Sequence, residues 1–119
     1  MRHNRLCLAA ALGLSCLLAT AAAPAASFDC ERASAADEKA ICANRSLNDL
    51  DVSMALLYRL DRRFLPMGGR DALIGQQQAW LKSRSQCAAS VSCLTAAYQQ
   101  RIKVLQDIID SRVVTQGPF

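Results

Sequence analysis

Four cysteines are the residues whose type and spacing most directly suggest chemistry in this chain. Of the six cysteines, Cys7 and Cys16 lie in an apolar N-terminal stretch, and four remain in the rest of the sequence. These four are Cys30, Cys42, Cys87 and Cys93. An even number of cysteines in a short exported domain predicts two disulfides. A zinc site would need close pairs of the C-x-x-C kind, so the spacing predicts no metal site.

The pairing of these cysteines is not decided by the sequence, because four cysteines allow three connectivities. We favour the two local pairs, Cys30 with Cys42 and Cys87 with Cys93. Each local link would join a helix end to an adjoining irregular segment. Through chain entropy, the two closures would stabilise the fold by about 3 and about 2 kcal/mol.

The other side chains do not form a recognised catalytic motif. The single histidine, His3, lies in the N-terminal stretch that is predicted to be removed, which would leave no imidazole as base or metal ligand. There is no G-x-S-x-G motif and no glycine-rich phosphate loop. Two of the ten acidic residues could in principle act as a glycosidase pair, but most lie on polar faces of the predicted helices. We therefore expect neither an enzyme nor a cofactor.

Residues 1–25 have the organisation of a secretory signal. Arg2 and Arg5 give a positive start, an apolar run follows, and Ala23-Pro24-Ala25 matches a signal peptidase site. A membrane anchor is the alternative, but a run of about 18 apolar residues is barely long enough to span a bilayer. We expect cleavage before Ala26, no membrane span afterwards, and a periplasmic or secreted protein.

The charge of the predicted mature chain is mild. Loss of Arg2 and Arg5 leaves 12 basic and 10 acidic residues, a net charge of +2. Nucleic-acid binding depends on a strong basic patch, so we expect no nucleic-acid partner.

The cysteines must be positioned by helices, because helical periodicity covers the predicted mature chain and no strand-like alternation appears. Ser34 and Ser46 are predicted N-caps of the first two helices. The predicted helices run from Ser34 to about Ala43, from Ser46 to before Pro66, from Arg70 or Asp71 to Ser85, and from Ser92 to Arg112. Pro66-Met67-Gly68-Gly69 is the clearest break. The fold class is all-α: three long antiparallel amphipathic helices plus a short N-terminal helix, forming one domain over residues 26–113 with a frayed tail at 114–119.

Several polar or aromatic side chains lie on or beside the apolar stripes of these helices. Asp51, Arg84 and Arg101 each border the stripe of a different long helix. A partly buried carboxylate and guanidinium would offset each other's desolvation, which predicts a structural network. Trp80 could anchor a partner, but its place on the apolar face favours core packing.

The sequence also resembles a known family of small exported proteins, the LprI type, named after a mycobacterial lysozyme-inhibitor lipoprotein. The resemblance covers about Ser27 to Leu105. It is carried by Phe28-Asp29-Cys30, Glu38-Lys39-Ala40-Ile41-Cys42, Leu47, Leu50-Asp51, Tyr58, Gln77, Trp80-Leu81, Arg84, Cys87, Cys93-Leu94, Tyr98 and Arg101-Ile102. It implies a helical periplasmic or cell-surface domain that inhibits lysozyme. Gly13 occupies the position where a lipoprotein signal ending at Cys16 needs an aliphatic residue, so surface anchoring is not carried over.

The segment from Arg62 to Arg70 is the best candidate for contact with a partner. Arg62, Arg63 and Arg70 place three guanidinium groups around a predicted turn, with Met67 as an apolar side chain that could be exposed. Lysozymes carry catalytic carboxylates in a cleft, which a positively charged loop would suit. The alternative is an ordinary turn with solvated arginines.

Two functions are therefore compatible with the sequence. The first is a stoichiometric inhibitor whose protein partner is a lysozyme or another wall-degrading enzyme. The second is a helical interaction or envelope-maintenance module that does not inhibit lysozyme. The net charge of +2 favours the second, because it would not steer the domain toward the many basic lysozymes.

Overall fold

The computed structural model describes residues 26–115, so the predicted signal sequence and residues 116–119 lie outside the described part. The elements are a 3₁₀ turn η1 (Cys30–Arg32), α1 (Ala36–Ala43), α2 (Arg45–Phe64), α3 (Met67–Ser85), α4 (Val91–Ile109) and a π-helical turn η2 (Asp110–Val114). No strand occurs between residues 26 and 115. The predicted all-α class is confirmed.

The caps of the first two helices differ from the sequence prediction. Asn44, and not Ser46, caps α2, because its Oδ1 accepts a hydrogen bond from the Leu47 amide at 3.1 Å. Ala35 precedes α1, and the Glu38 carboxylate accepts from the Ser34 amide at 3.1 Å. Both predicted serine caps are therefore wrong. At α1, Glu38 at the third helical position reaches back and accepts from the amides of Ser34 and Ala35, and no serine side chain caps the helix.

The turn between α2 and α3 is shorter than predicted. α3 begins at Met67, directly after Pro66, so Gly68 and Gly69 belong to its first turn. Only Leu65 and Pro66 separate the helices. Proline fits at this position because its fixed φ suits the entry to a helix and the missing N–H is not needed there. The predicted four-residue break is thus wrong, although the chain does reverse at this point.

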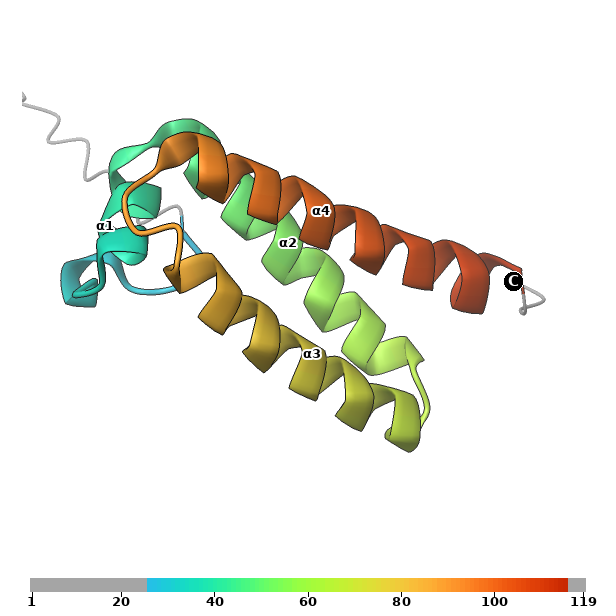
Figure 1. Cartoon of the computed structure of the whole chain (residues 1–119). Coiled ribbons are helices and arrows are strands. Elements are labelled where there is room, and N and C mark those ends of the chain that lie inside the picture. The colour runs from blue at the N-terminus through green and yellow to red at the C-terminus, as the bar shows by residue number, and fades with distance from the viewer. Residues whose placement is uncertain (1–25, 116–119) are drawn as a thin grey trace, which may run out of the picture.

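Consecutive long helices run antiparallel, as predicted, so α2 and α4 point the same way (Figure 1). α2 and α4 pack closely along their length, whereas α3 makes fewer contacts with either of them. α1 packs against α2 and α3 at the end of the bundle where α4 begins (Figure 1). The bundle is therefore a tight helix pair with a third helix that diverges from it.

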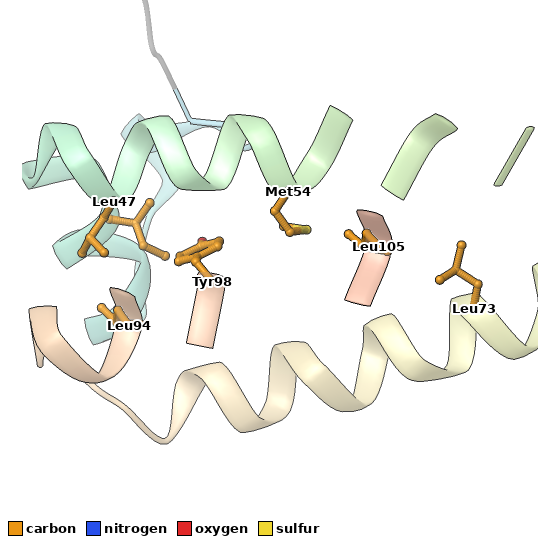
Figure 2. Packing of buried hydrophobic residues seen from close by; sticks show 7 residues of the cluster. Leu47, Met54, Leu73, Leu94, Tyr98 and Leu105 are labelled. Atoms are coloured by element: carbon orange, nitrogen blue, oxygen red, sulfur yellow. The ribbon is translucent and has the colours of Figure 1, made fainter. Parts of the chain in front are cut away.

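The buried apolar side chains form a line along the bundle and not a broad layer. Figure 2 shows Leu47, Leu94 and Tyr98 toward one end and Leu73 toward the other. The core comprises Ile41, Leu47, Met54, Leu73, Leu94, Tyr98 and Leu105. Leu73 is the only apolar side chain of α3 in this buried set, which agrees with the looser packing of that helix.

Both disulfides join the favoured local pairs. Cys30 is bonded to Cys42 and links η1 to the last turn of α1. Cys87 is bonded to Cys93 and closes the turn between α3 and α4. Each link therefore holds a helix end against an irregular segment, which stabilises the end of the bundle that α1 covers.

Candidate functional site

The α2–α3 turn presents basic and apolar side chains together at one end of the bundle. Arg62 and Arg63 are exposed on the last turn of α2. Two large apolar side chains flank the turn, with Phe64 55 % exposed and Met67 77 % exposed. Exposed apolar side chains ringed by charge are typical of protein-binding surfaces.

A fourth arginine, which sequence reasoning missed, joins the three predicted ones. Arg59, Arg62, Arg63 and Arg70 line a hollow of about 420 Å³. Within residues 26–115, none of these four arginines takes part in an ion pair. Arg59 lies three and four residues before Arg62 and Arg63, and this helical spacing was the signal that could have identified it. We call this feature the arginine hollow.

Arg70 is the most enclosed member of the arginine hollow. It is half-buried, its Nη2 lies 3.5 Å from the Leu65 carbonyl oxygen, and its buried Nε has no partner among the described residues. Arg62 instead lies over the Tyr58 ring, with its Cζ 5.7 Å from the ring centroid. The hollow therefore holds four positive charges that are not neutralised by the described part of the chain.

A groove between α2 and α3 adjoins the arginine hollow. Its volume is about 710 Å³, and at its far end it reaches Ala26 and Phe28. Its walls include Val52, Ala55, Tyr58, Ile74, Gln78 and Leu81. Arg59 lines both the groove and the arginine hollow. The sequence did not indicate this groove, because the divergence of α3 could not be foreseen.

The predicted network residues Asp51 and Arg84 are joined through an intermediate side chain. Arg84 Nε donates to Asp37 Oδ2 at 3.0 Å, and Arg84 Nη1 donates to the Tyr98 hydroxyl at 3.1 Å. That hydroxyl donates in turn to Asp51 Oδ1 at 2.8 Å. The carboxylate that pairs directly with Arg84 is therefore that of Asp37 and not that of Asp51. Sequence reasoning did not identify Asp37, because the expected network comprised residues of the three long helices and Asp37 lies on the short helix α1.

The environment of this network keeps its phenol protonated. Burial raises the pKa of Tyr98 well above its ordinary value, and the negative charge of Asp51 raises the same pKa further. Trp80 packs edge-on against Tyr98, with 5.2 Å between ring centroids, and its Nε1 donates to the Ala97 carbonyl at 3.2 Å. Trp80 therefore contributes to packing between α3 and α4.

Arg101 belongs to a second buried polar cluster, separate in its hydrogen bonds from Arg84 and Asp51. Its Nε donates to Gln77 Oε1 at 2.9 Å. Both carboxylate oxygens of the buried Asp61 lack a hydrogen-bond partner among the described residues. Burial raises the pKa of Asp61 to about 6, and the positive charge of Arg101 lowers that pKa in part. Burial also lowers the pKa of Arg101.

Neither polar cluster has the arrangement of a metal centre. Among residues 26–115, no group of three or more His, Cys, Asp or Glu side chains is placed to hold a metal ion. In the same range, no helix combines the length and the apolar character that crossing a membrane requires.

Comparison with known proteins identifies the family. No curated protein and no solved structure matches the chain. The family model described as "Lysozyme inhibitor LprI" matches residues 30–105, a range that contains both disulfides, the α2–α3 turn and both buried polar clusters. The chain therefore belongs to the LprI lysozyme inhibitor family.

Proposed function

We propose that this protein is an exported inhibitor that binds a lysozyme stoichiometrically through its α2–α3 turn. Membership of the LprI family is the observation that carries this proposal. The two disulfides fit an oxidising location outside the cytoplasm.

The chemistry of the turn supports its role as the contact surface. Met67 and Phe64 offer exposed apolar area, and Arg62, Arg63 and Arg70 surround them with positive charge. A lysozyme cleft contains two carboxyl groups beside the scissile bond. The turn would therefore meet complementary charge when it enters such a cleft.

The experiment is a wall-clearance assay with increasing amounts of the exported protein against lysozymes of several types. We expect inhibition that saturates at one inhibitor per enzyme. Replacing Arg62, Arg63 and Arg70 together by serine should raise the inhibition constant by about 10- to 100-fold, since each lost charge contact contributes a few tenths to one kcal/mol. Inhibition should also weaken as salt rises.

A matched control removes the same charge elsewhere. Lys39, Arg45 and Lys82 are exposed and lie outside the arginine hollow. Their replacement by serine should leave inhibition unchanged. If both triple variants weakened inhibition equally, the α2–α3 turn would not be the contact surface. No inhibition by the unaltered protein would favour the envelope-module function, with which the net charge of +2 also agrees.

A further inference from the structure

The face between α2 and α3 combines two surfaces of opposite character along one line. On α2, Val52, Ala55, Arg59 and Arg62 follow each other by three or four residues, so they share one side of the helix. On α3, which runs antiparallel, Arg70 lies at the turn end and Leu81 lies farther along. The apolar groove and the arginine hollow are therefore parts of a single elongated site.

The two parts meet at Arg59, which lines both. The ten-residue step from Val52 to Arg62 corresponds to about 15 Å along the helix axis. The groove is open enough to leave Val52 44 % exposed and Leu81 40 % exposed, so apolar surface there is available to a ligand. At the other end of the groove lie Glu38 and Asp51, whose carboxylates would disfavour an anionic group at that end.

We propose that this face binds one anionic amphiphile of the phospholipid class, with its phosphate in the arginine hollow and its acyl chain in the groove. Guanidinium groups bind phosphate oxygens in a bidentate manner, and four of them here lack a carboxylate partner in the described part of the chain. The acyl chain would cover the exposed apolar side chains of α2 and α3. This inference concerns a ligand other than lysozyme and does not depend on inhibition.

The test uses calorimetric titration of the exported protein, with both disulfides formed, against dodecyl phosphate below its micelle concentration. Two further titrations use inorganic phosphate, which lacks the chain, and dodecyl maltoside, which lacks the charge. We expect dodecyl phosphate to bind one-to-one and at least about tenfold tighter than either, a difference of about 1.4 kcal/mol. Shortening the alkyl chain should weaken binding by up to about fourfold per methylene.

Substitutions locate the two parts of the ligand. Replacing Arg59, Arg62 and Arg63 by serine should abolish the preference for dodecyl phosphate over dodecyl maltoside, whereas serine at Lys39, Arg45 and Lys82 should preserve it. Val52→Asn with Leu81→Gln should remove the dependence on chain length. The matched pair Leu56→Gln with Val104→Asn changes side chains that are 48 % and 40 % exposed but do not line the groove, and it should have no effect.

The outcomes separate this proposal from the one on lysozyme. Equal affinity for the phosphate and maltoside detergents, or binding of inorganic phosphate as tight as that of dodecyl phosphate, would overturn the two-part site. Equal effects of the site variants and their matched controls would also overturn it. The clearance assay measures inhibition without added amphiphile, so either proposal can fail while the other holds.

Discussion

Arg84 connects four elements of the bundle through side-chain hydrogen bonds. Its guanidinium, on α3, bonds Asp37 on α1 and Tyr98 on α4, and Tyr98 bonds Asp51 on α2. Asp51 also accepts a hydrogen bond from the Ser27 amide at 2.6 Å, which holds the segment before η1 against α2. Since α3 makes few close contacts with the other helices, this polar network is a main link between α3 and the rest of the domain, together with the packing of Trp80 against Tyr98.

Arg84→Ala should therefore destabilise the fold by about 3 kcal/mol, because it leaves the buried Asp37 carboxylate without its partner. Urea unfolding with both disulfides intact measures this loss. Lys103→Ala is the control, since the Lys103–Asp107 pair is exposed and should contribute less than about 1 kcal/mol. A loss for Arg84→Ala that is no larger than for Lys103→Ala would contradict the structural role of the network.

At the scale of the helices, periodicity located the four α-helices of residues 26–115 and the C-terminal ends of α1 and α3, but it did not locate where the helices begin. The apolar spacing of α2 and α4 involves many residues, so it still predicts a helix when one position departs from the pattern. A helix start depends on one side chain, and at α2 the start went to Asn44 where Ser46 was also suitable. The two glycines after Pro66 suggested a loop, yet α3 begins at Met67 and includes both of them in its first turn.

α3 is the least firmly held of the long helices, and a glycine in its interior weakens it further. A Cβ added at Gly75 would meet nothing within 4 Å. Gly75→Ala should thus raise the free energy of unfolding by up to about 1 kcal/mol, since alanine loses less backbone entropy in a helix. Gly68→Ala also meets open space but lies in the first turn of α3, where a smaller gain is expected. Thermal unfolding of both variants tests whether the gain in stability is larger for Gly75→Ala than for Gly68→Ala. A loss of stability for Gly75→Ala would show that position 75 contacts another part of the protein.

At the scale of the whole molecule, the residues that could not be predicted are those whose environment depends on how the helices meet. The spacing of Arg59 from Arg62 and Arg63 could be read from the sequence, but the hollow that they share with Arg70 forms because α3 returns beside α2. Asp61 is buried near Arg101 because α2 and α4 pack side by side in the same direction. By contrast, the local disulfides could be predicted, because both partners of each bond lie close in sequence.

The buried Asp61 makes the stability of the whole domain depend on pH. Its pKa is about 6 in the fold and has an ordinary value of 3.8, so between about pH 4 and pH 6 the folded state keeps a proton that the unfolded state has lost. The contribution of the Asp61 carboxyl group to the free energy of unfolding is therefore fully present below pH 4 and is lost as pH rises through 6. Across that window, the loss of this contribution should lower the free energy of unfolding by up to about 3 kcal/mol.

Asp61→Asn isolates this contribution, because an amide of nearly the same shape carries no charge at any of these pH values. We expect the difference in unfolding free energy between Asp61→Asn and the unaltered protein to shift in favour of the variant as pH rises from 4 to 7. Asp107→Asn serves as the control, since Asp107 is exposed and pairs only with Lys103 within the described residues. Chemical unfolding at each pH measures both. A difference that does not vary with pH for Asp61→Asn would mean that the carboxylate is ionised in the fold, with the positive charge of Arg101 outweighing the effect of burial.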